Sequence, residues 1–188
     1  LGFMNKHSTI FFAAALVVGL LLTRTRRALI EKWFWVGAAL ALLIVLPNVI
    51  WEWRHDWATL ELLNNVRATG KNVIHPPLEF LIQQVLIMNP ATLPLWLAGV
   101  WFFLVDRESR RHRHFGLAFI VFLGLMIVMH AKHYYVAPAY PMLFAAGGVW
   151  WAGRMERVRG FRWLRVAYPA LLAVAGGALA PLVLPVLP

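Results

Sequence analysis

Residues 33–50 read WFWVGAALALLIVLPNVI, a stretch without a single charged side chain. A transmembrane helix needs about 20 largely apolar residues to cross the hydrocarbon core of a bilayer. This segment is therefore predicted to span a membrane, interrupted only by a Pro-Asn pair near its end. Three tryptophans follow it, Trp51, Trp53 and Trp57. They suit the interfacial belt that tryptophan forms at membrane surfaces.

Apolar segments of this kind recur along the chain. Backbone pairing in lipid allows helices or closed barrels, and long apolar runs without alternation of period two favour helices. We expect an all-α, polytopic transmembrane helix bundle with about six spans, forming a single transmembrane domain over residues 1–188. Besides Trp33–Ile50, the predicted spans are Phe3–Leu22, a tilted or interfacial helix from Leu78 leading into Leu95–Val105, Phe115–Ala131, Val136–Ala152 and about Leu164–Leu187.

The composition agrees with this architecture. Hydrophobic residues make up 61% of the chain and charged residues 14%, whereas soluble domains have roughly half and a quarter. The apolar runs cover the whole length, which excludes a signal peptide ahead of a soluble domain. The absence of cysteine excludes disulfides and thiolate chemistry. Because the chain opens with Leu1-Gly2-Phe3 and has no initiating Met, we expect a fragment of a longer protein.

The positive charge is concentrated in alternate connections. Segments 23–32, 106–114 and 153–165 hold four, four and five Lys and Arg residues, thirteen of the 18 in the chain. The six-span arrangement puts all three on one side, and the positive-inside rule makes that side the cytoplasm. Basic loops beside anionic lipid account for the net charge of +10. Membrane lipids are thus expected partners, and nucleic acid is not.

Histidine and tyrosine gather on the opposite side. Residues 51–77 form the longest polar stretch and are predicted to be an outer-face loop with an interfacial helix. Side chains predicted at this face can bind anions, donate hydrogen bonds or move protons. They are His7, His55, His75, His130, His133, Tyr134 and Tyr135.

Two lysines at this face are candidates for phosphate binding. Lys6 lies just inside the first predicted span, where an ammonium group is costly unless it snorkels to the interface or meets a partner such as a lipid phosphate. Lys132 opens the segment Lys132-His133-Tyr134-Tyr135, a plausible cradle for a phosphate headgroup. The alternative for this segment is an interfacial Tyr/Lys anchor.

Three further side chains are candidates for acid–base chemistry. His55-Asp56 lies beside the tryptophans, and an imidazole next to a carboxylate can transfer protons or bind a metal. A solvated loop pair is the alternative. Glu79 follows Pro76-Pro77 at a predicted helix start, where a carboxylate also favours the helix dipole. The histidines lack tight ligand spacing, so no metal site is assigned and a divalent metal stays open as a cofactor.

Three stretches resemble polytopic glycosyltransferases of the dolichyl-phosphate-mannose protein mannosyltransferase type, including bacterial relatives similar to aminoarabinose transferases. They are LGFMNK at 1–6, WEWRHDW at 51–57 and the stretch from Lys132 to Gly148. The resemblance implies part of the glycosyltransferase C fold in a bacterial inner membrane. It also implies a polyprenyl- or dolichyl-phosphate sugar donor and transfer to a lipid, glycan or protein acceptor on the outer or lumenal face.

The resemblance also implies roles for residues. Lys6 and Lys132 would stabilise the lipid phosphate as it leaves the anomeric carbon, with His133, Tyr134 and Tyr135 beside it. The best-known acidic residue of the family lies in its first outer loop, so the catalytic base is expected upstream of this chain. Asp56, Glu79 and His55 are then only assisting candidates.

Two other functions fit the same pattern of spans. A transporter or permease fragment also has several apolar helices, prolines within spans and scattered polar groups. Polar groups at one face, rather than at mid-membrane, argue against it. A non-catalytic membrane scaffold, whose outer loop binds another protein, is the third interpretation.

Overall fold

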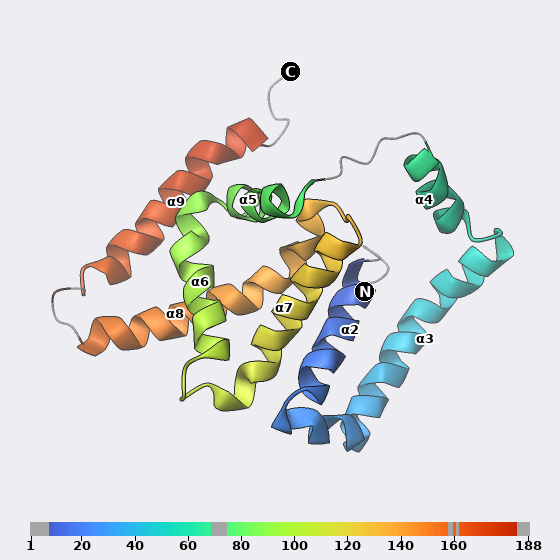
Figure 1. The fold of residues 1–188 in the computed structure, drawn as a ribbon, viewed down its shortest axis with the longest axis horizontal. Coiled ribbons are helices and arrows are strands. Elements are labelled where there is room, and N and C mark those ends of the chain that lie inside the picture. Colours follow the sequence, from blue (N-terminus) through green and yellow to red (C-terminus); the bar gives the residue numbers. More distant parts are fainter. Residues whose placement is uncertain (1–7, 69–74, 158–159, 161, 184–188) are drawn as a thin grey trace.

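A computed structural model describes residues 8–68, 75–157, 160 and 162–183. Every regular element in these residues is helical, which confirms the all-α prediction. The elements (Figure 1) are α2 (Ser8–Leu21), η1 (Arg24–Ile30), α3 (Lys32–Arg54), α4 (Ala58–Ala68), α5 (Pro77–Ile87), η2 (Pro90–Thr92), α6 (Leu93–Leu104), η3 (Arg110–His112), α7 (Arg113–Val128), η4 (His133–Ala139), α8 (Tyr140–Arg157) and α9 (Leu164–Val183), where η marks a 3-10 helix.

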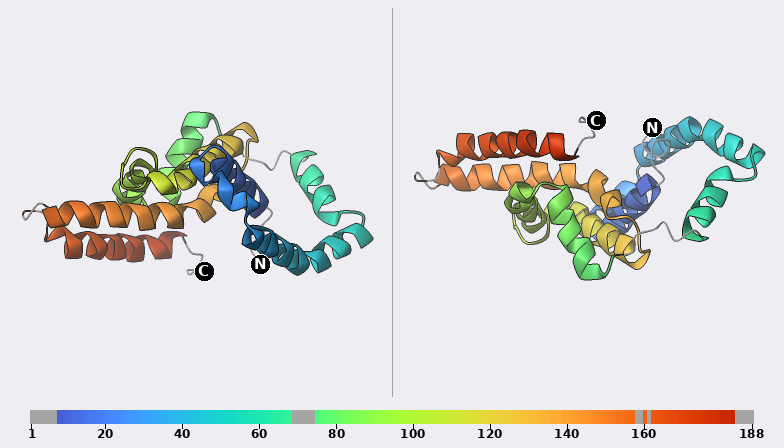
Figure 2. Two further views of the ribbon diagram at one scale, coloured as in Figure 1. Left: turned by 90° about the horizontal axis from the view of Figure 1, so that it is seen from below. Right: turned by 90° about the horizontal axis from the view of Figure 1, so that it is seen from above.

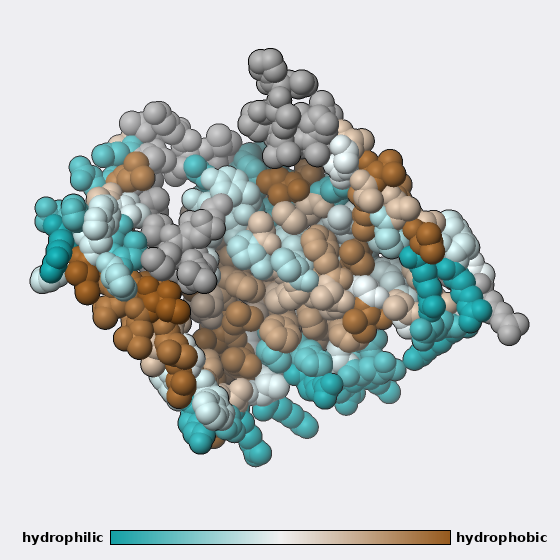
Figure 3. Space-filling model, turned by 180° about the vertical axis from the view of Figure 1, so that it is seen from behind, coloured by the Kyte–Doolittle hydropathy of each residue, from teal (hydrophilic) through white to brown (hydrophobic). Residues whose placement is uncertain are grey.

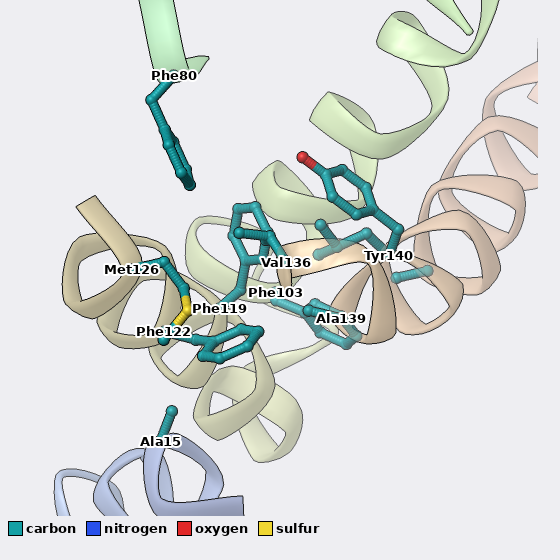
Figure 4. Close-up of a cluster of buried hydrophobic side chains, with 11 residues drawn as sticks. Ala15, Phe80, Phe103, Phe119, Phe122, Met126, Val136, Ala139 and Tyr140 are labelled. Carbon is teal, nitrogen blue, oxygen red and sulfur yellow. The ribbon is translucent and has the colours of Figure 1, made fainter. Parts of the chain in front are cut away.

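The core lies among α2, α6, α7 and α8, with η4 closing one end. Figure 4 shows Phe119, Phe122 and Met126 on α7 facing side chains from η4 and α8. Phe122 and Tyr140 are fully buried. Burying a large apolar side chain contributes roughly 1.5–3 kcal/mol. These contacts therefore fix α7 and the start of α8 relative to one another.

Glycines let two helix pairs approach closely. A Cβ at Gly147 of α8 would overlap the carbonyl oxygen of Leu95 on α6, and one at Gly99 would overlap that of Leu143. Gly19 plays the same part between α2 and α7, against the carbonyl of His114. Small residues at such crossings are typical of packed membrane helices, where backbones meet directly.

Helix α3 packs against little else in the structure. It is apolar on all sides, and no residue within its apolar 18-residue window is buried. Its buried side chain is Glu52, near its end. The Glu52 carboxylate accepts hydrogen bonds from the backbone N–H of Thr59, at 3.2 Å, and from the Thr59 hydroxyl. These bonds turn the chain back into α4, while the rest of α3 presents apolar side chains suited to lipid.

The prediction of six spans is wrong. By length and apolar composition, two helices among the described residues are able to cross a membrane, Lys32–Arg54 and Arg110–Val128. Two bent pairs, Ser8–Leu21 with Arg24–Ile30 and Pro77–Ile87 with Pro90–Leu104, raise the number to four if each counts as one span. These helices indicate an integral membrane protein with two to four candidate spans.

The first predicted span ends within one residue of its predicted end, Leu22. Its described part, Ser8–Leu21, has 14 residues, and residues 3–7 of the prediction lie outside the described residues. The Thr23 hydroxyl bonds back to the carbonyls of Gly19 and Leu20, both at 3.1 Å, and so satisfies the end of the helix. The chain then turns by 119° into η1.

The break between the helix predicted from Leu78 and the segment Leu95–Val105 lies at Asn89. This residue has a φ of 64°, and its side chain accepts a hydrogen bond from the N–H of Ala91 at 3.1 Å. Pro90 follows and cannot donate a backbone hydrogen bond. Helices on the two sides of this break meet at 93°. Helix α6 is only 12 residues long, about 18 Å.

The last two predicted spans fail for different reasons. Residues 133–139 form a 3-10 helix with Pro138 inside, so α8 starts at Tyr140 rather than at Val136. It then runs on to Arg157 through charged residues, which leaves no apolar window long enough to cross a bilayer. The apolar part of α9 within the described residues, Leu164–Ala178, is too short to count as a span, and residues 184–187 of the last predicted span lie outside the described residues. The two helices lie side by side and antiparallel (Figure 2).

Candidate functional site

The structure brings together two segments that are far apart in the sequence, at the point where α5 begins and η4 crosses it. The Nδ1 atom of His75 lies 2.8 Å from a carboxylate oxygen of Glu79. The ring of His75 meets that of His133 edge-to-face, at 5.1 Å between centroids. Tyr134 and Tyr135 continue the chain of ring contacts, at 5.6 and 5.0 Å. We call these five residues the histidine cluster.

The start of α5 explains half of this geometry. Pro77 occupies the first turn, where its missing N–H costs nothing. Glu79 lies in the same turn, where the helix dipole favours a negative charge. His75 sits four residues before Glu79, so its imidazole reaches back to the carboxylate. The side chain of His75 is 9% exposed and that of Glu79 is 50% exposed, so the carboxylate faces outward from the pair.

A buried glutamine holds the other half in place. Gln84 is 3% exposed, and its Nε2 donates to the carbonyl of His133 at 3.0 Å and to that of Phe80 at 3.2 Å. The hydroxyl of Tyr140 donates to Gln84 Oε1 at 3.2 Å. One side chain on α5 thus ties η4 and α8 to the position of the histidine cluster.

Burial controls protonation in the cluster. It lowers the pKa of the His133 imidazole, and the neighbouring His75 lowers it further. The Nδ1 of His133 is buried and has no hydrogen-bond partner within the described residues. Burial also raises the pKa of the Tyr135 phenol; Tyr134 adds to the rise and the charge of Lys132 opposes it. Burial therefore favours the neutral imidazole at His133 and the neutral phenol at Tyr135.

Most sequence-predicted candidates meet here. Lys132, His133, Tyr134 and Tyr135 form one continuous turn, with Lys132 half-buried at its start. Glu79 joins them from α5. Lys6 lies outside the described residues, so its predicted role is untested.

His55 and Asp56 lie elsewhere. The ring of His55 stacks on Trp51 at 4.3 Å, and its Nδ1 is 2.8 Å from the Trp51 carbonyl. Asp56 and Trp57 follow with φ values of 52° and 58°, which form the corner between α3 and α4. In Figure 1 this corner stands apart from α5 and η4. Within the described residues the structure does not unite His55 or Asp56 with the histidine cluster.

Sequence reasoning missed the pairing of His75 with Glu79 and the role of Gln84. The pair is local, at a spacing of i,i+4, but the contacts of His75 and Gln84 with His133 join distant segments, which spacing alone does not reveal. A glutamine within an apolar helix was the available signal, because such a polar group must find a partner. In the described part of the chain, no three His, Asp or Glu side chains come close enough together to hold a metal ion.

Arginine-rich connections lie away from this cluster. In Figure 1 η1 and η3 lie at the lower edge, and α5 and η4 lie at the upper edge. Figure 3 shows an apolar band over the helices, with hydrophilic side chains along the lower edge. Arg154, Arg157 and Arg165 lie at the far end of the α8–α9 pair (Figure 2). The helices α6 and α7 thus join a basic end to the end that holds the histidine cluster.

Comparison with known proteins gives one similarity. Residues 1–51 match the family model of dolichyl-phosphate-mannose-protein mannosyltransferases. This range includes the LGFMNK stretch and ends at Trp51, so the stretch from Lys132 to Gly148 lies outside it. No curated protein and no solved structure matches the chain.

Proposed function

We propose that this chain is a segment of a membrane glycosyltransferase that takes its sugar from a polyprenyl- or dolichyl-phosphate donor. Similarity of residues 1–51 to the mannosyltransferase family supports a transferase and a lipid-linked donor. The candidate spans support a membrane location. The acceptor is a lipid, a glycan or a protein, and the reaction takes place on the face that carries the histidine cluster, opposite the cytoplasm.

The observation that carries the proposal is the contact between the two halves of the histidine cluster. Lys132 supplies a half-buried cation, and His133 and the tyrosines supply hydrogen-bonding groups beside it. A leaving lipid phosphate gathers negative charge as its bond to the anomeric carbon breaks. Preorganised donors and cations aimed at that charge are worth more in the transition state than in the ground state.

The acceptor must lose a proton as its oxygen or nitrogen attacks the sugar. Glu79 is the best-placed carboxylate in the described chain, because His75 orients it at 2.8 Å and half of its side chain is exposed. We assign it an assisting role in positioning or proton transfer. The principal base is expected upstream, as the resemblance implies. Asp56 and His55 have a structural role at the α3–α4 corner, and Lys6 remains a second phosphate ligand by prediction.

Sugar transfer in proteoliposomes tests this proposal with the full-length protein. Lys132→Ala should lower the rate of transfer from a polyprenyl-phosphate sugar by about a hundredfold, the usual loss for one transition-state donor. Arg54→Ala, which removes an exposed cation at the end of α3, should leave transfer within about threefold of the parent. Transfer that is unchanged by Lys132→Ala, in protein with an unchanged melting temperature, would refute the role of Lys132.

A second variant tests the acidic partner. Glu79→Gln keeps the shape of the side chain but removes its charge. We expect a loss of about tenfold in kcat with little change in KM, because an assisting carboxylate acts in the transition state. Glu61→Gln on α4 is the matched control and should have no effect. Equal rates for all three proteins would exclude Glu79 from the reaction.

A further inference from the structure

A second polar site lies at the basic end, between η1 and the start of α7. Here the structure has a cavity of about 700 Å³. Four arginines line it, Arg24 from η1 and Arg110, Arg111 and Arg113 from the connection that leads into α7. We call this the arginine pocket. It does not depend on the histidine cluster or on the proposed function.

No acidic side chain lines the arginine pocket. The nearby acids are engaged elsewhere, because Glu108 lies 3.4 Å from Arg157 and Asp106 accepts the backbone N–H of Glu108 at 2.9 Å. None of the ion pairs in the described residues involves a pocket arginine. Four guanidinium groups around one cavity repel one another, so an anion between them would lower the energy of the folded protein.

Arg113 gives a second observation at the same place. Its Nε is buried and has no hydrogen-bond partner among the described residues, an unfavourable state for a charged group. Arg113 is also the first residue of α7, where the helix dipole adds to the positive potential. An oxyanion in the cavity would supply a countercharge to the guanidinium group.

The walls of the cavity indicate what carries that anion. Leu22, Leu104 and Leu117 line it along with the arginines and two threonines. Leu22 follows the end of α2, and Leu104 ends α6. An apolar wall next to guanidinium groups, at the ends of apolar helices, matches the boundary between headgroups and acyl chains. Arginine binds phosphate oxygens in pairs with good geometry.

We propose that the arginine pocket binds the phosphate group of an anionic membrane phospholipid. The two threonine hydroxyls are engaged within the protein, that of Thr23 with the carbonyls of Gly19 and Leu20 and that of Thr25 at 3.3 Å from the Nδ1 of His114, so the arginines supply the donors for the phosphate. Bound lipid would clamp η1 to the start of α7. The site therefore joins two connections that otherwise hold unneutralised charge.

Lipid binding by the purified full-length protein tests this proposal. The protein is placed in nanodiscs of neutral phosphatidylcholine, and affinity for added phosphatidylglycerol is measured by native mass spectrometry and by melting temperature. Arg24→Gln/Arg111→Gln removes two exposed pocket charges and spares Arg113. The matched control is Arg26→Gln/Arg27→Gln. It removes two charges from η1, the 3-10 helix that holds Arg24, at positions that do not line the cavity.

The pocket variant should bind phosphatidylglycerol about tenfold to thirtyfold more weakly than the parent, at about 1 kcal/mol per charge. The control should stay within about threefold. Equal weakening of both variants would overturn the site, because it would indicate general surface attraction. An unchanged affinity of the pocket variant for phosphatidylglycerol would also overturn the site.

A third arm separates lipid from free phosphate. Inorganic phosphate is added to the protein in phosphatidylcholine nanodiscs at the same ionic strength as a chloride control. We expect no rise in melting temperature at millimolar phosphate, since the apolar wall then has no partner. A rise that disappears in the pocket variant, without any preference for phosphatidylglycerol, would overturn the assignment to a lipid.

Discussion

Where α5 meets η4, imidazoles, phenols and a carboxylate lie in contact with one another, and a buried glutamine donates to the backbone beneath them. Where η1 meets η3, four arginines line a cavity whose described lining holds no acidic side chain. The first end pairs an imidazole with a carboxylate. The second end gathers cations without a countercharge in its lining. The excess of basic residues therefore serves different purposes at the two ends. The histidine cluster should be sensitive to the loss of its internal contacts, and the arginine pocket to the loss of anionic lipid.

The two ends stay apart only if α6 and α8 remain packed. Gly147→Ala should be the most damaging change, because the new Cβ would overlap the Leu95 carbonyl and force the helices apart. We expect a loss of about 3 kcal/mol in the free energy of unfolding, measured by denaturant titration in detergent. Gly148→Ala is the control, since its Cβ would meet nothing within 4 Å. Equal stability of the two variants would mean that the crossing is looser than described.

A smaller effect is expected from the glutamine beneath the histidine cluster. Gln84→Leu leaves the His133 carbonyl and the Tyr140 hydroxyl without their partner. Such losses cost about 2 kcal/mol, visible in the same titration. Gln83→Leu, at the neighbouring half-buried position, should cost much less. If Gln83→Leu is the more harmful variant, the two glutamines have the opposite roles.

The smallest effect is the pH dependence that His133 contributes at the histidine cluster. The pKa of His133 is lowered in the folded protein, so the unfolded chain binds more protons once the pH falls below its ordinary value of about 6.5. Stability should therefore decrease as the pH drops from 7.5 to 5.5. Melting temperature measured over this range should decrease less in His133→Gln. Parallel curves for the two proteins would contradict the burial of this imidazole.

Much of the fold follows from local sequence. The apolar run at 33–50 predicted α3, and that at 115–131 predicted α7 to within a few residues. The breaks after Leu22 and ahead of Leu95 fall where connections were predicted. Apolar character did not predict how sharply the chain bends there, because the side-chain hydrogen bonds of Thr23 and Asn89 set the local geometry.

The candidate site was predictable in part. Lys132 to Tyr135 stood out because cationic and phenolic groups were adjacent in the sequence. The contribution of His75 and Gln84 depends on how α5 packs against η4, a contact between distant segments. The arginine pocket could not be predicted from the sequence for the same reason, because η1 and η3 are distant in the chain and meet only in the folded structure. Composition predicted anionic lipid near these loops but gave no specific site.

The proposed function requires the histidine cluster and the arginine pocket to face opposite sides of a membrane. Because these 188 residues contain no cysteine, Lys132→Cys and Arg111→Cys each add one labelling site at a known end. A membrane-impermeant maleimide applied to intact cells should modify the cysteine at 132, and should modify the cysteine at 111 only after the membrane is opened. Labelling of both positions from the same side would contradict the account.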